Sequence, residues 1–170
     1  MFGKPKIEIT PEFSVLFVCL GNICRSPTAE GVFRTAVEKA GLGARIRVDS
    51  AGLGNYHVGS PPDRRAIQAA SKRGYDLAKQ QCRQVDVADF TSFGWILAMD
   101  DSIMNALVKM RPAEFGGHLG LLLDFAPELG VREVPDPYYG APAGFERVLD
   151  LVEVSTAGLL ARIQPTLDGG

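Results

Sequence analysis

A cysteine and an arginine placed six residues apart are the residues with the clearest chemical potential in this sequence. Cys19 and Arg25 belong to CLGNICRS, which joins an apolar run to a segment that opens Arg-Ser-Pro. A helix starting there presents unpaired N–H groups and the positive end of its dipole, and a tight turn before it directs further amides inward. We therefore expect a backbone cradle for an anion, and a phosphate dianion suits it.

Cys19 is the expected nucleophile of this loop. The surrounding amides and Arg25 stabilise negative charge, and the thiolate is the reactive form of cysteine. Arg25 offers a planar fork of donors that can hold two phosphoryl oxygens while charge moves in the transition state. Ser26 can donate its hydroxyl hydrogen to the Cys19 sulfur. A simple helix-capping role for Ser26 is the alternative.

The residues between Cys19 and Arg25 fit a tightly curved loop. Gly21 and Asn22 are residue types that tolerate the left-handed region. The spacing alone is weak evidence, and a buried structural role for Cys19 is the alternative; the order of strand, glycine-bearing loop and helix start gives the pattern its weight. Phosphate-binding positions are expected at Leu20, Gly21, Asn22, Ile23, Cys24 and Ser26.

Asp136, in PDPYYG, is the candidate for proton transfer. Cleavage of a phosphate ester requires a proton for the departing oxygen. Pro135 and Pro137 restrict the backbone on both sides and would hold the carboxyl group in place. As a carboxylate, Asp136 would then activate the water that attacks a phosphocysteine. A role as a turn former is the alternative, since Asp is common beside Pro in turns.

Three tyrosines are candidates for the walls of a substrate slot. Tyr138 and Tyr139 follow Asp136, and Tyr56 lies in the loop AGLGNYHVGSPP. Aromatic rings on two sides would suit a flat substrate ring. A deep slot would favour phosphotyrosine, whose phosphate lies farther from the backbone than that of phosphoserine. Taken singly, each tyrosine is more often only an aromatic residue on a surface or rim.

The segments around these residues alternate between strand and helix patterns. Strands are expected at the apolar or alternating segments 14–20, 44–50 and 94–100, with weaker candidates at 118–125 and 131–135. The three-four spacing of apolar residues predicts helices at 27–40, 63–73, 101–110 and 145–163. This alternation predicts a three-layer α/β fold with a mainly four-stranded parallel sheet flanked by helices.

In such a sheet, ligands bind beyond the carboxyl ends of the strands, where the phosphate loop follows the first strand. Ser50 and Asp100 end the second and third expected strands, so both are expected near the loop as supporting residues. For Asp100, capping a helix is an equally good alternative. One domain is expected over 1–170, with 1–13 as a polar N-terminal lead-in whose order the sequence leaves open.

Composition excludes several classes of protein. The 18 basic and 20 acidic side chains give a net charge of -2, without general attraction to nucleic acid or an anionic membrane. Apolar runs fall short of the ~20 residues of a membrane span, and the run before the loop is too short for a signal peptide. Three cysteines and two histidines show neither a disulfide-scaffold nor a zinc pattern. We expect a cytoplasmic protein without metal or cofactor.

The segment VLFVCLGNICRSPTAE resembles, nearly letter for letter, the phosphate loop of low-molecular-weight protein tyrosine phosphatases. VDSAG, LAMD and DPYYG also resemble that family, in the same order, over residues 15–140. The resemblance implies metal-independent hydrolysis of phosphotyrosine through a phosphocysteine. It also implies that Asp136 is the general acid, that Ser50 braces Asn22, and that a phosphotyrosine protein is the partner. A tyrosine autokinase is suggested by analogy.

Two positions raise further questions within this resemblance. Lys79 stands where many members carry a histidine that supports the loop, so part of that support should differ. Cys24 could form a reversible disulfide with Cys19 that protects the nucleophile, as the resemblance implies. A small thiol packed beneath the loop is the alternative for Cys24.

Other functions remain as alternatives. An arsenate reductase of the same fold would need a downstream cysteine pair, and only Cys82 follows the loop. A non-catalytic phosphotyrosine-binding module would lack Cys19, Arg25 or Asp136, and all three are present. A phosphatase for small molecules is a further alternative.

Overall fold

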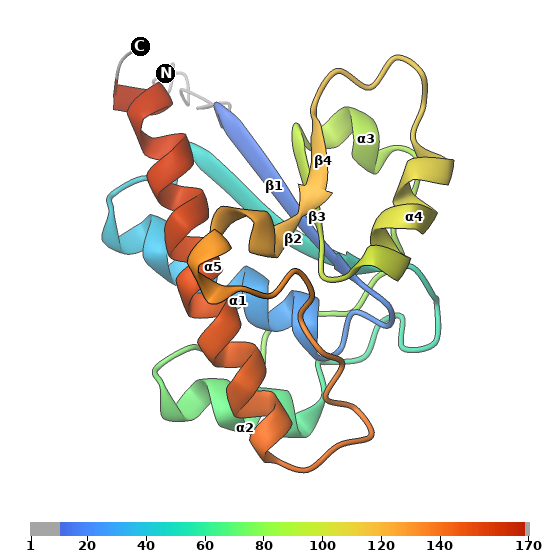
Figure 1. Cartoon of the computed structure of the whole chain (residues 1–170), viewed down its shortest axis with the longest axis vertical. Coiled ribbons are helices and arrows are strands. Elements are labelled where there is room, and N and C mark those ends of the chain that lie inside the picture. The colour runs from blue at the N-terminus through green and yellow to red at the C-terminus, as the bar shows by residue number, and fades with distance from the viewer. Residues whose placement is uncertain (1–10, 169–170) are drawn as a thin grey trace, which may run out of the picture.

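Four parallel strands form one sheet between two layers of helices in the computed structural model, which describes residues 11–168 (Figure 1). The strand order is β2-β1-β3-β4. The strands are β1 (Phe13–Cys19), β2 (Ile46–Gly52), β3 (Trp95–Ala98) and β4 (His118–Leu121). The predicted three-layer α/β fold is therefore confirmed.

Helices cover both faces of this sheet. They are α1 (Arg25–Lys39), α2 (Arg64–Lys72), α3 (Asp89–Ser92), α4 (Asp101–Met110), the 3-10 helices η1 (Leu122–Phe125) and η2 (Pro127–Leu129), and α5 (Ala143–Asp168). Val15 and Phe17 of β1 belong to the core beneath α1 and α5, whereas Leu16 and Val18 belong to the core beneath α3 and α4. Because β1 is buried on both faces, its sequence is a continuous apolar run.

Three helices begin close to the carboxyl ends of the strands. α1 starts after the loop that follows β1. The Asp63 carboxylate accepts the backbone N–H of Arg65 at the start of α2, and the Asp100 carboxylate accepts that of Ile103 at the start of α4. Polar side chains needed to cap the helices are thereby brought to the edge of the sheet where ligands bind.

The structure corrects several expected boundaries. The weaker strand candidate at 131–135 is wrong: Val134 donates one backbone hydrogen bond to Met99, and Pro135 has no N–H to extend a ladder. The candidate at 118–125 divides into β4 and η1. β1 ends one residue before Leu20, and β2 continues two residues past Ser50 to Gly52. Residues 1–10 of the lead-in lie outside the described residues.

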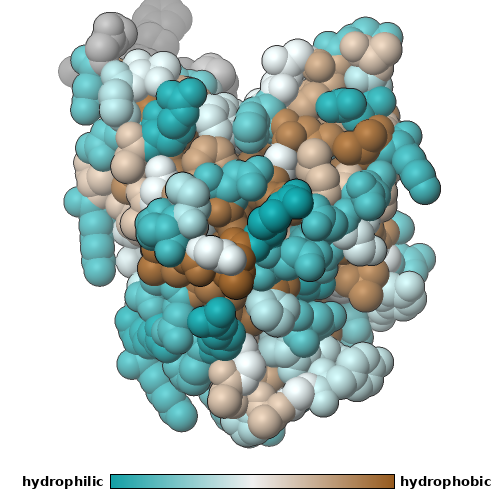
Figure 2. Space-filling model, viewed as in Figure 1, coloured by the Kyte–Doolittle hydropathy of each residue, from teal (hydrophilic) through white to brown (hydrophobic). Residues whose placement is uncertain are grey.

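Hydrophilic side chains cover much of the face shown in Figure 2, and hydrophobic side chains gather mainly in its middle. Among the helices at residues 11–168, none combines the length and apolar character needed to cross a membrane. The same part of the chain contains no cluster of three or more His, Cys, Asp or Glu side chains arranged to hold a metal ion.

Candidate active site

The phosphate loop, defined as residues 19–25, runs from the end of β1 to the first turn of α1. Asn22 has a positive φ of 58°, which turns the chain sharply. Gly52 at the end of β2 lies directly against the loop: a Cβ there would be 2.8 Å from the Asn22 nitrogen and 2.9 Å from the Leu20 oxygen. The loop therefore packs closely on a strand distant in sequence.

The backbone amides of this loop are available to a ligand. Within the described residues, no backbone N–H of residues 20–24 donates a hydrogen bond to another protein atom. The loop lies at the base of a cavity of about 420 Å³. The cavity is lined by Cys19, Leu20, Gly21, Ile23, Cys24, Arg25, Tyr56, His57, Asp136, Tyr138 and Tyr139. A cavity with unpaired amides at its base is suited to a tetrahedral anion.

A buried chain of hydrogen bonds supports the sulfur of Cys19. The Cys19 sulfur lies 2.9 Å from the Ser26 hydroxyl oxygen, which in turn accepts a hydrogen bond of 2.9 Å from the Asn22 side-chain amide. Since the Ser26 oxygen is already an acceptor, its hydrogen can point to sulfur. The backbone oxygen of Ala51, its other possible acceptor, is farther away at 3.4 Å. The Ser26 hydroxyl is therefore placed to donate a hydrogen bond to the Cys19 sulfur.

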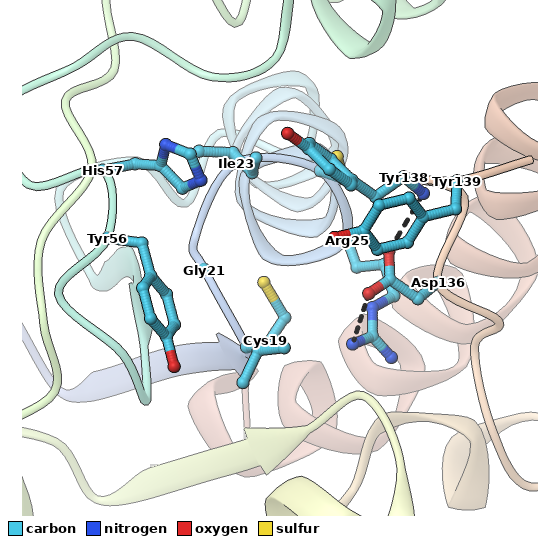
Figure 3. A pocket seen from close by; sticks show the side chains of 11 residues that line it. Cys19, Gly21, Ile23, Arg25, Tyr56, His57, Asp136, Tyr138 and Tyr139 are labelled. Carbon is cyan, nitrogen blue, oxygen red and sulfur yellow. Dashed lines mark hydrogen bonds and ion pairs between the residues drawn. The ribbon is translucent and has the colours of Figure 1, made fainter.

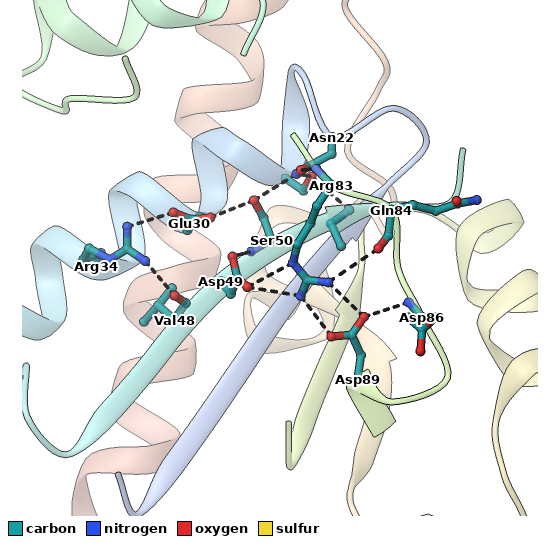
Figure 4. A network of polar contacts seen from close by, with 12 residues as sticks. Asn22, Glu30, Arg34, Val48, Asp49, Ser50, Arg83, Gln84, Asp86 and Asp89 are labelled. Atoms are coloured by element: carbon teal, nitrogen blue, oxygen red, sulfur yellow. Dashed lines mark hydrogen bonds and ion pairs between the residues drawn. The ribbon is translucent and has the colours of Figure 1, made fainter. Parts of the chain in front are cut away.

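The same chain continues away from the pocket and ends at a buried carboxyl group (Figure 4). Asn22 also donates to the Ser50 hydroxyl at 2.9 Å, and Ser50 donates to Glu30 at 2.8 Å. Arg34 donates to the second Glu30 oxygen at 2.8 Å. Burial raises the pKa of the Glu30 carboxyl, against the opposing effects of Arg34 and Ser50. Glu30 therefore fixes the direction in which Ser50 donates.

A second contact fixes the orientation of the Asn22 side chain. Its carbonyl oxygen accepts the backbone N–H of Arg83 at 2.9 Å, so its NH₂ group must face Ser26 and Ser50. The guanidinium group of Arg83 bridges two carboxylates, Asp49 and Asp89, at 3.1 and 3.0 Å (Figure 4). The polar side of the loop is thus tied to β2 and to the start of α3.

Arg25 is held with part of its donor set left free. One terminal nitrogen, Nη1, donates to Asp100 at 2.6 Å and to the backbone oxygen of Val134 at 2.9 Å. Among the residues that the structure describes, the Nε and Nη2 groups have no partner other than Asp136, at an ion-pair distance of 3.8 Å, so they remain for a ligand. Because only 4% of the side chain is exposed, Arg25 cannot turn away into solvent. Its free edge suits two oxygens of one phosphoryl group.

Asp136 approaches this cavity from a separate segment, the acid loop (residues 134–142). Its side chain is 44% exposed, and one carboxylate oxygen accepts the backbone N–H of Tyr138 at 3.1 Å. Figure 3 shows Cys19 between Tyr56 on one side and Asp136, Tyr138 and Tyr139 on the other. The tyrosines therefore form two walls above the phosphate loop, with a carboxyl group at one of them.

The other two cysteines are free thiols: Cys24 belongs to the loop itself, and Cys82 contacts it from a distant segment. Burial, the largest effect, strongly raises the pKa of Cys24, and the nearby Asp63 carboxylate raises it further. Cys82 donates its S–H to the backbone oxygen of Asn22 at 2.8 Å, and burial raises its pKa to about 11. Both thiols are therefore held in the protonated form at neutral pH.

The structure brings nearly all the sequence-predicted site residues together, but not all in the expected way. Asn22 and Ser26 do not line the cavity; their buried side chains lie beneath the loop. Ser26 makes no side-chain cap, whereas Asp100 both caps α4 and contacts Arg25. Lys79 is exposed, and the cation beside Glu30 is Arg34.

Sequence reasoning missed several residues around the site. His57, in the same loop as Tyr56, lines the cavity, and its ring lies 3.4 Å from where a Gly21 Cβ would stand. For Glu30, Arg34 and Arg83, no motif or spacing in the sequence indicated a role in the site. A charged residue on the apolar face of α1 could have drawn attention to Glu30.

Comparisons with known proteins agree with this geometry. Residues 14–167 match the family described as low molecular weight phosphotyrosine protein phosphatase. The low molecular weight protein-tyrosine-phosphatase YfkJ of Bacillus subtilis is 41% identical over 151 residues, which cover 89% of this chain and 96% of that protein.

Two solved structures show the same fold. A protein tyrosine phosphatase from Entamoeba histolytica, with Hepes in its active site, superposes with a TM-score of 0.87 at 36% identity, covering 91% of this chain and 98% of that one. A Drosophila protein titled an arginine phosphatase superposes with a TM-score of 0.82 at 31% identity, covering 87% of this chain and 96% of that one.

Proposed function

Because this chain belongs to the low molecular weight phosphotyrosine protein phosphatase family, we propose that Cys19, Arg25 and Asp136 together hydrolyse phosphotyrosine through a phosphocysteine. The chain is a phosphatase by its family. The assignment of each role rests on the geometry of the cavity. The proposal treats residues 1–170 as one phosphatase domain.

Binding of the phosphate group would use the phosphate loop. The loop residues Leu20, Gly21, Ile23 and Cys24, whose backbone N–H groups are free within the described residues, line the cavity together with Arg25, whose Nε and Nη2 groups are available. Together they match the three oxygens of a phosphoryl group and the negative charge that these carry. The aromatic ring of the substrate would lie between Tyr56 and the pair Tyr138 and Tyr139.

In the first step, the Cys19 thiolate attacks phosphorus, and an S–P bond forms as the bond from phosphorus to the phenolic oxygen breaks. Asp136 enters as the neutral acid and gives its proton to that oxygen, so that tyrosine leaves as a neutral phenol. Arg25 and the loop amides hold the equatorial oxygens as charge moves among them. Ser26 donates a hydrogen bond to sulfur before the attack and after the later cleavage.

In the second step, water attacks phosphorus and the S–P bond breaks. Asp136, now a carboxylate, accepts the proton of the attacking water. Inorganic phosphate and the Cys19 thiolate are the products. These residues and the attacking water account for every proton and electron pair that the two steps need, so the proposal uses no metal or cofactor.

We assign the substrate to phosphotyrosine-containing proteins, with a tyrosine autokinase as the proposed partner by analogy. The aromatic side chains that line the cavity support a ring between phosphate and backbone. Three free cysteines, two of them buried beside the nucleophile, support a reducing compartment such as the cytoplasm. Because the similar Drosophila protein is described as an arginine phosphatase, phosphoarginine is the natural competing substrate to test.

The observation that carries the proposal is the Cys19 sulfur at the base of a cavity that also contains the free edge of Arg25 and the Asp136 carboxyl group. The test measures hydrolysis of para-nitrophenyl phosphate in EDTA, and of matched phosphotyrosine, phosphoserine and phosphoarginine peptides. We expect turnover selective for phosphotyrosine, lost completely in Cys19→Ser. Thermal stabilisation of Cys19→Ser by inorganic phosphate would show that the cradle of this variant is intact.

Mass spectrometry of denaturant-quenched enzyme should find phosphate on Cys19 during turnover. Activity in Cys19→Ser, or an intermediate on another residue, would overturn the mechanism. A preference for phosphoarginine peptides would keep the mechanism and replace the substrate.

A further inference from the structure

The acid loop has few polar contacts with the rest of the described chain. Val134, at its start, exchanges hydrogen bonds with Met99 and Arg25. Beyond Val134, two side chains from other elements reach it among the described residues: Arg25, at 3.8 Å from Asp136, and Arg65, which donates to the backbone oxygen of Tyr138 at 3.0 Å. Pro137 is buried and Tyr138 packs against the core, and these two arginines supply the polar contacts that bear most directly on the carboxyl group.

Arg65 is itself held in one orientation. Its Nε and Nη2 groups donate to the two oxygens of Asp63, at 3.1 and 2.9 Å. The guanidinium carbon lies 5.5 Å from the centre of the Tyr138 ring and 4.7 Å from that of Phe145. A forked contact on one edge and aromatic rings within cation–π distance restrict its rotation. The hydrogen bond from Arg65 also lowers the pKa of Asp63, which keeps this partner charged.

Asp63 joins this arginine to the phosphate loop. Its backbone N–H donates to the backbone oxygen of Ile23 at 2.7 Å. On the other side, Tyr138 accepts from Arg65 through its carbonyl oxygen, while its own N–H holds a carboxylate oxygen of Asp136 at 3.1 Å. A continuous path of short contacts thus runs from the loop that would hold the phosphate to the carboxyl group that would hold the proton.

We propose that Arg65 is a positioning residue for proton transfer, which sets the distance between Asp136 and the phosphate loop by holding Tyr138. This inference rests on the proposed function of Asp136. The Arg65 side chain is 44% exposed, and an exposed ion pair contributes little to stability. Its role is geometric: a displaced acid cannot protonate the leaving oxygen efficiently, even in a fully folded enzyme.

The test compares Arg65→Ala with wild type on aryl phosphates whose leaving phenols differ widely in acidity. For phenyl phosphate, kcat/KM should fall at least about tenfold, because a shift of about 1 Å at a reacting group can cost up to about a hundredfold. For para-nitrophenyl phosphate, which needs less help from a proton, the fall should be small. Arg64→Ala is the matched control, since Arg64 is an exposed neighbour on the same helix without a polar contact to the described acid loop.

Two further variants separate positioning from structure. In an Asp136→Ala background, Arg65→Ala should cause no further loss for phenyl phosphate, because the acid that it positions is already absent. Arg65→Lys keeps the charge without the fork and should recover only part of the activity. An equal loss for all leaving groups, an additive loss in the double variant or full recovery by lysine would each overturn the inference.

Failure of this inference can be told apart from failure of the proposed function. If Asp136→Ala shows steep dependence on the leaving group while Arg65→Ala behaves like Arg64→Ala, the inference alone is overturned. If Asp136→Ala shows no such dependence, the proposed acid is wrong and the inference about Arg65 is overturned with it.

Discussion

The phosphate loop and the acid loop meet in one cavity but are held in place very differently. Asn22, Ser26 and Ser50 beneath the phosphate loop are each at most 3% exposed, and hydrogen bonds within the protein join them. In the acid loop, Asp136 is 44% exposed and Tyr139 is 95% exposed. One loop is fixed by a buried network, and the other by a few side chains from distant elements.

This difference fits the role that we propose for each loop. Stabilisation of a phosphoryl group requires dipoles that are already oriented, because reorienting them during the reaction would raise the barrier. A proton donor above the cavity must instead allow the substrate ring to enter and leave. Effects on the phosphate loop should therefore be the same for all substrates, whereas effects on the acid loop should depend on the leaving group.

Replacement of the acid should give the largest leaving-group effect. In Asp136→Ala, kcat/KM for phenyl phosphate should fall about 10²–10⁴-fold, the usual contribution of general acid catalysis. Activity on leaving groups that need no proton should fall least, and competitive inhibition by inorganic phosphate should persist. Steady-state kinetics over a series of aryl phosphates checks this. Equal losses across the series would remove Asp136 from the mechanism.

Disruption of the phosphate loop should give a loss that is uniform across leaving groups. Asn22→Ala removes the hydrogen bonds to Ser26 and Ser50 and places alanine at φ 58°. We expect kcat/KM to fall about a hundredfold for every aryl phosphate, with weaker inhibition by inorganic phosphate. Asn22→Gly is the matched control, because glycine adopts this backbone conformation without strain.

The glycine variant separates the two causes of that loss. If Asn22→Gly is as impaired as Asn22→Ala, the side-chain network positions the cradle. Full activity in Asn22→Gly would show that the backbone turn alone is enough to position the phosphate loop. The proposed contrast, in which a buried hydrogen-bond network holds the phosphate loop but not the acid loop, would then be wrong.

The smallest expected effect is on how the stability of the fold depends on pH, through the buried Glu30 carboxyl group. Burial raises the pKa of Glu30 above 4.5, so its contribution to stability is complete at low pH and is lost as the pH rises through the folded-state value. Glu30→Gln cannot ionise, and its melting temperature should therefore improve relative to wild type as the pH rises above 4.5, by a few degrees at most. Thermal unfolding at several pH values checks this; a constant difference would contradict it.

The sequence predicted the fold because its signals are local. The buried run in β1, the helix that opens at Arg25 and the caps at Asp63 and Asp100 can each be recognised within a few residues. The segment 131–135 was wrongly read as a strand because apolar alternation does not reveal whether a neighbouring strand has a free edge. Val134 makes its one backbone bond beyond the end of β3.

The sequence predicted some residues of the candidate site but not others. Cys19, Arg25 and Asp136 were found because their residue types carry chemistry, although their roles remain predictions. Arg65 and Glu30 were missed because their importance comes from partners up to 73 residues away, such as Tyr138 for Arg65, and no local pattern encodes such a contact. Lys79 is exposed, as a changed support of the loop at this position would allow, and the cation beside Glu30 comes from α1 itself.

The close packing of Gly52 against the phosphate loop has a consequence for the evolutionary history of this chain. A methyl group at position 52 would press on the backbone of the phosphate loop at Leu20, Gly21 and Asn22, although Gly52 does not line the cavity. We therefore expect substitutions of Gly52 to be as unfavourable as substitutions within the loop. A change of substrate specificity can instead arise from substitutions near the exposed residues Tyr56 and Tyr139, while the phosphate loop stays unchanged.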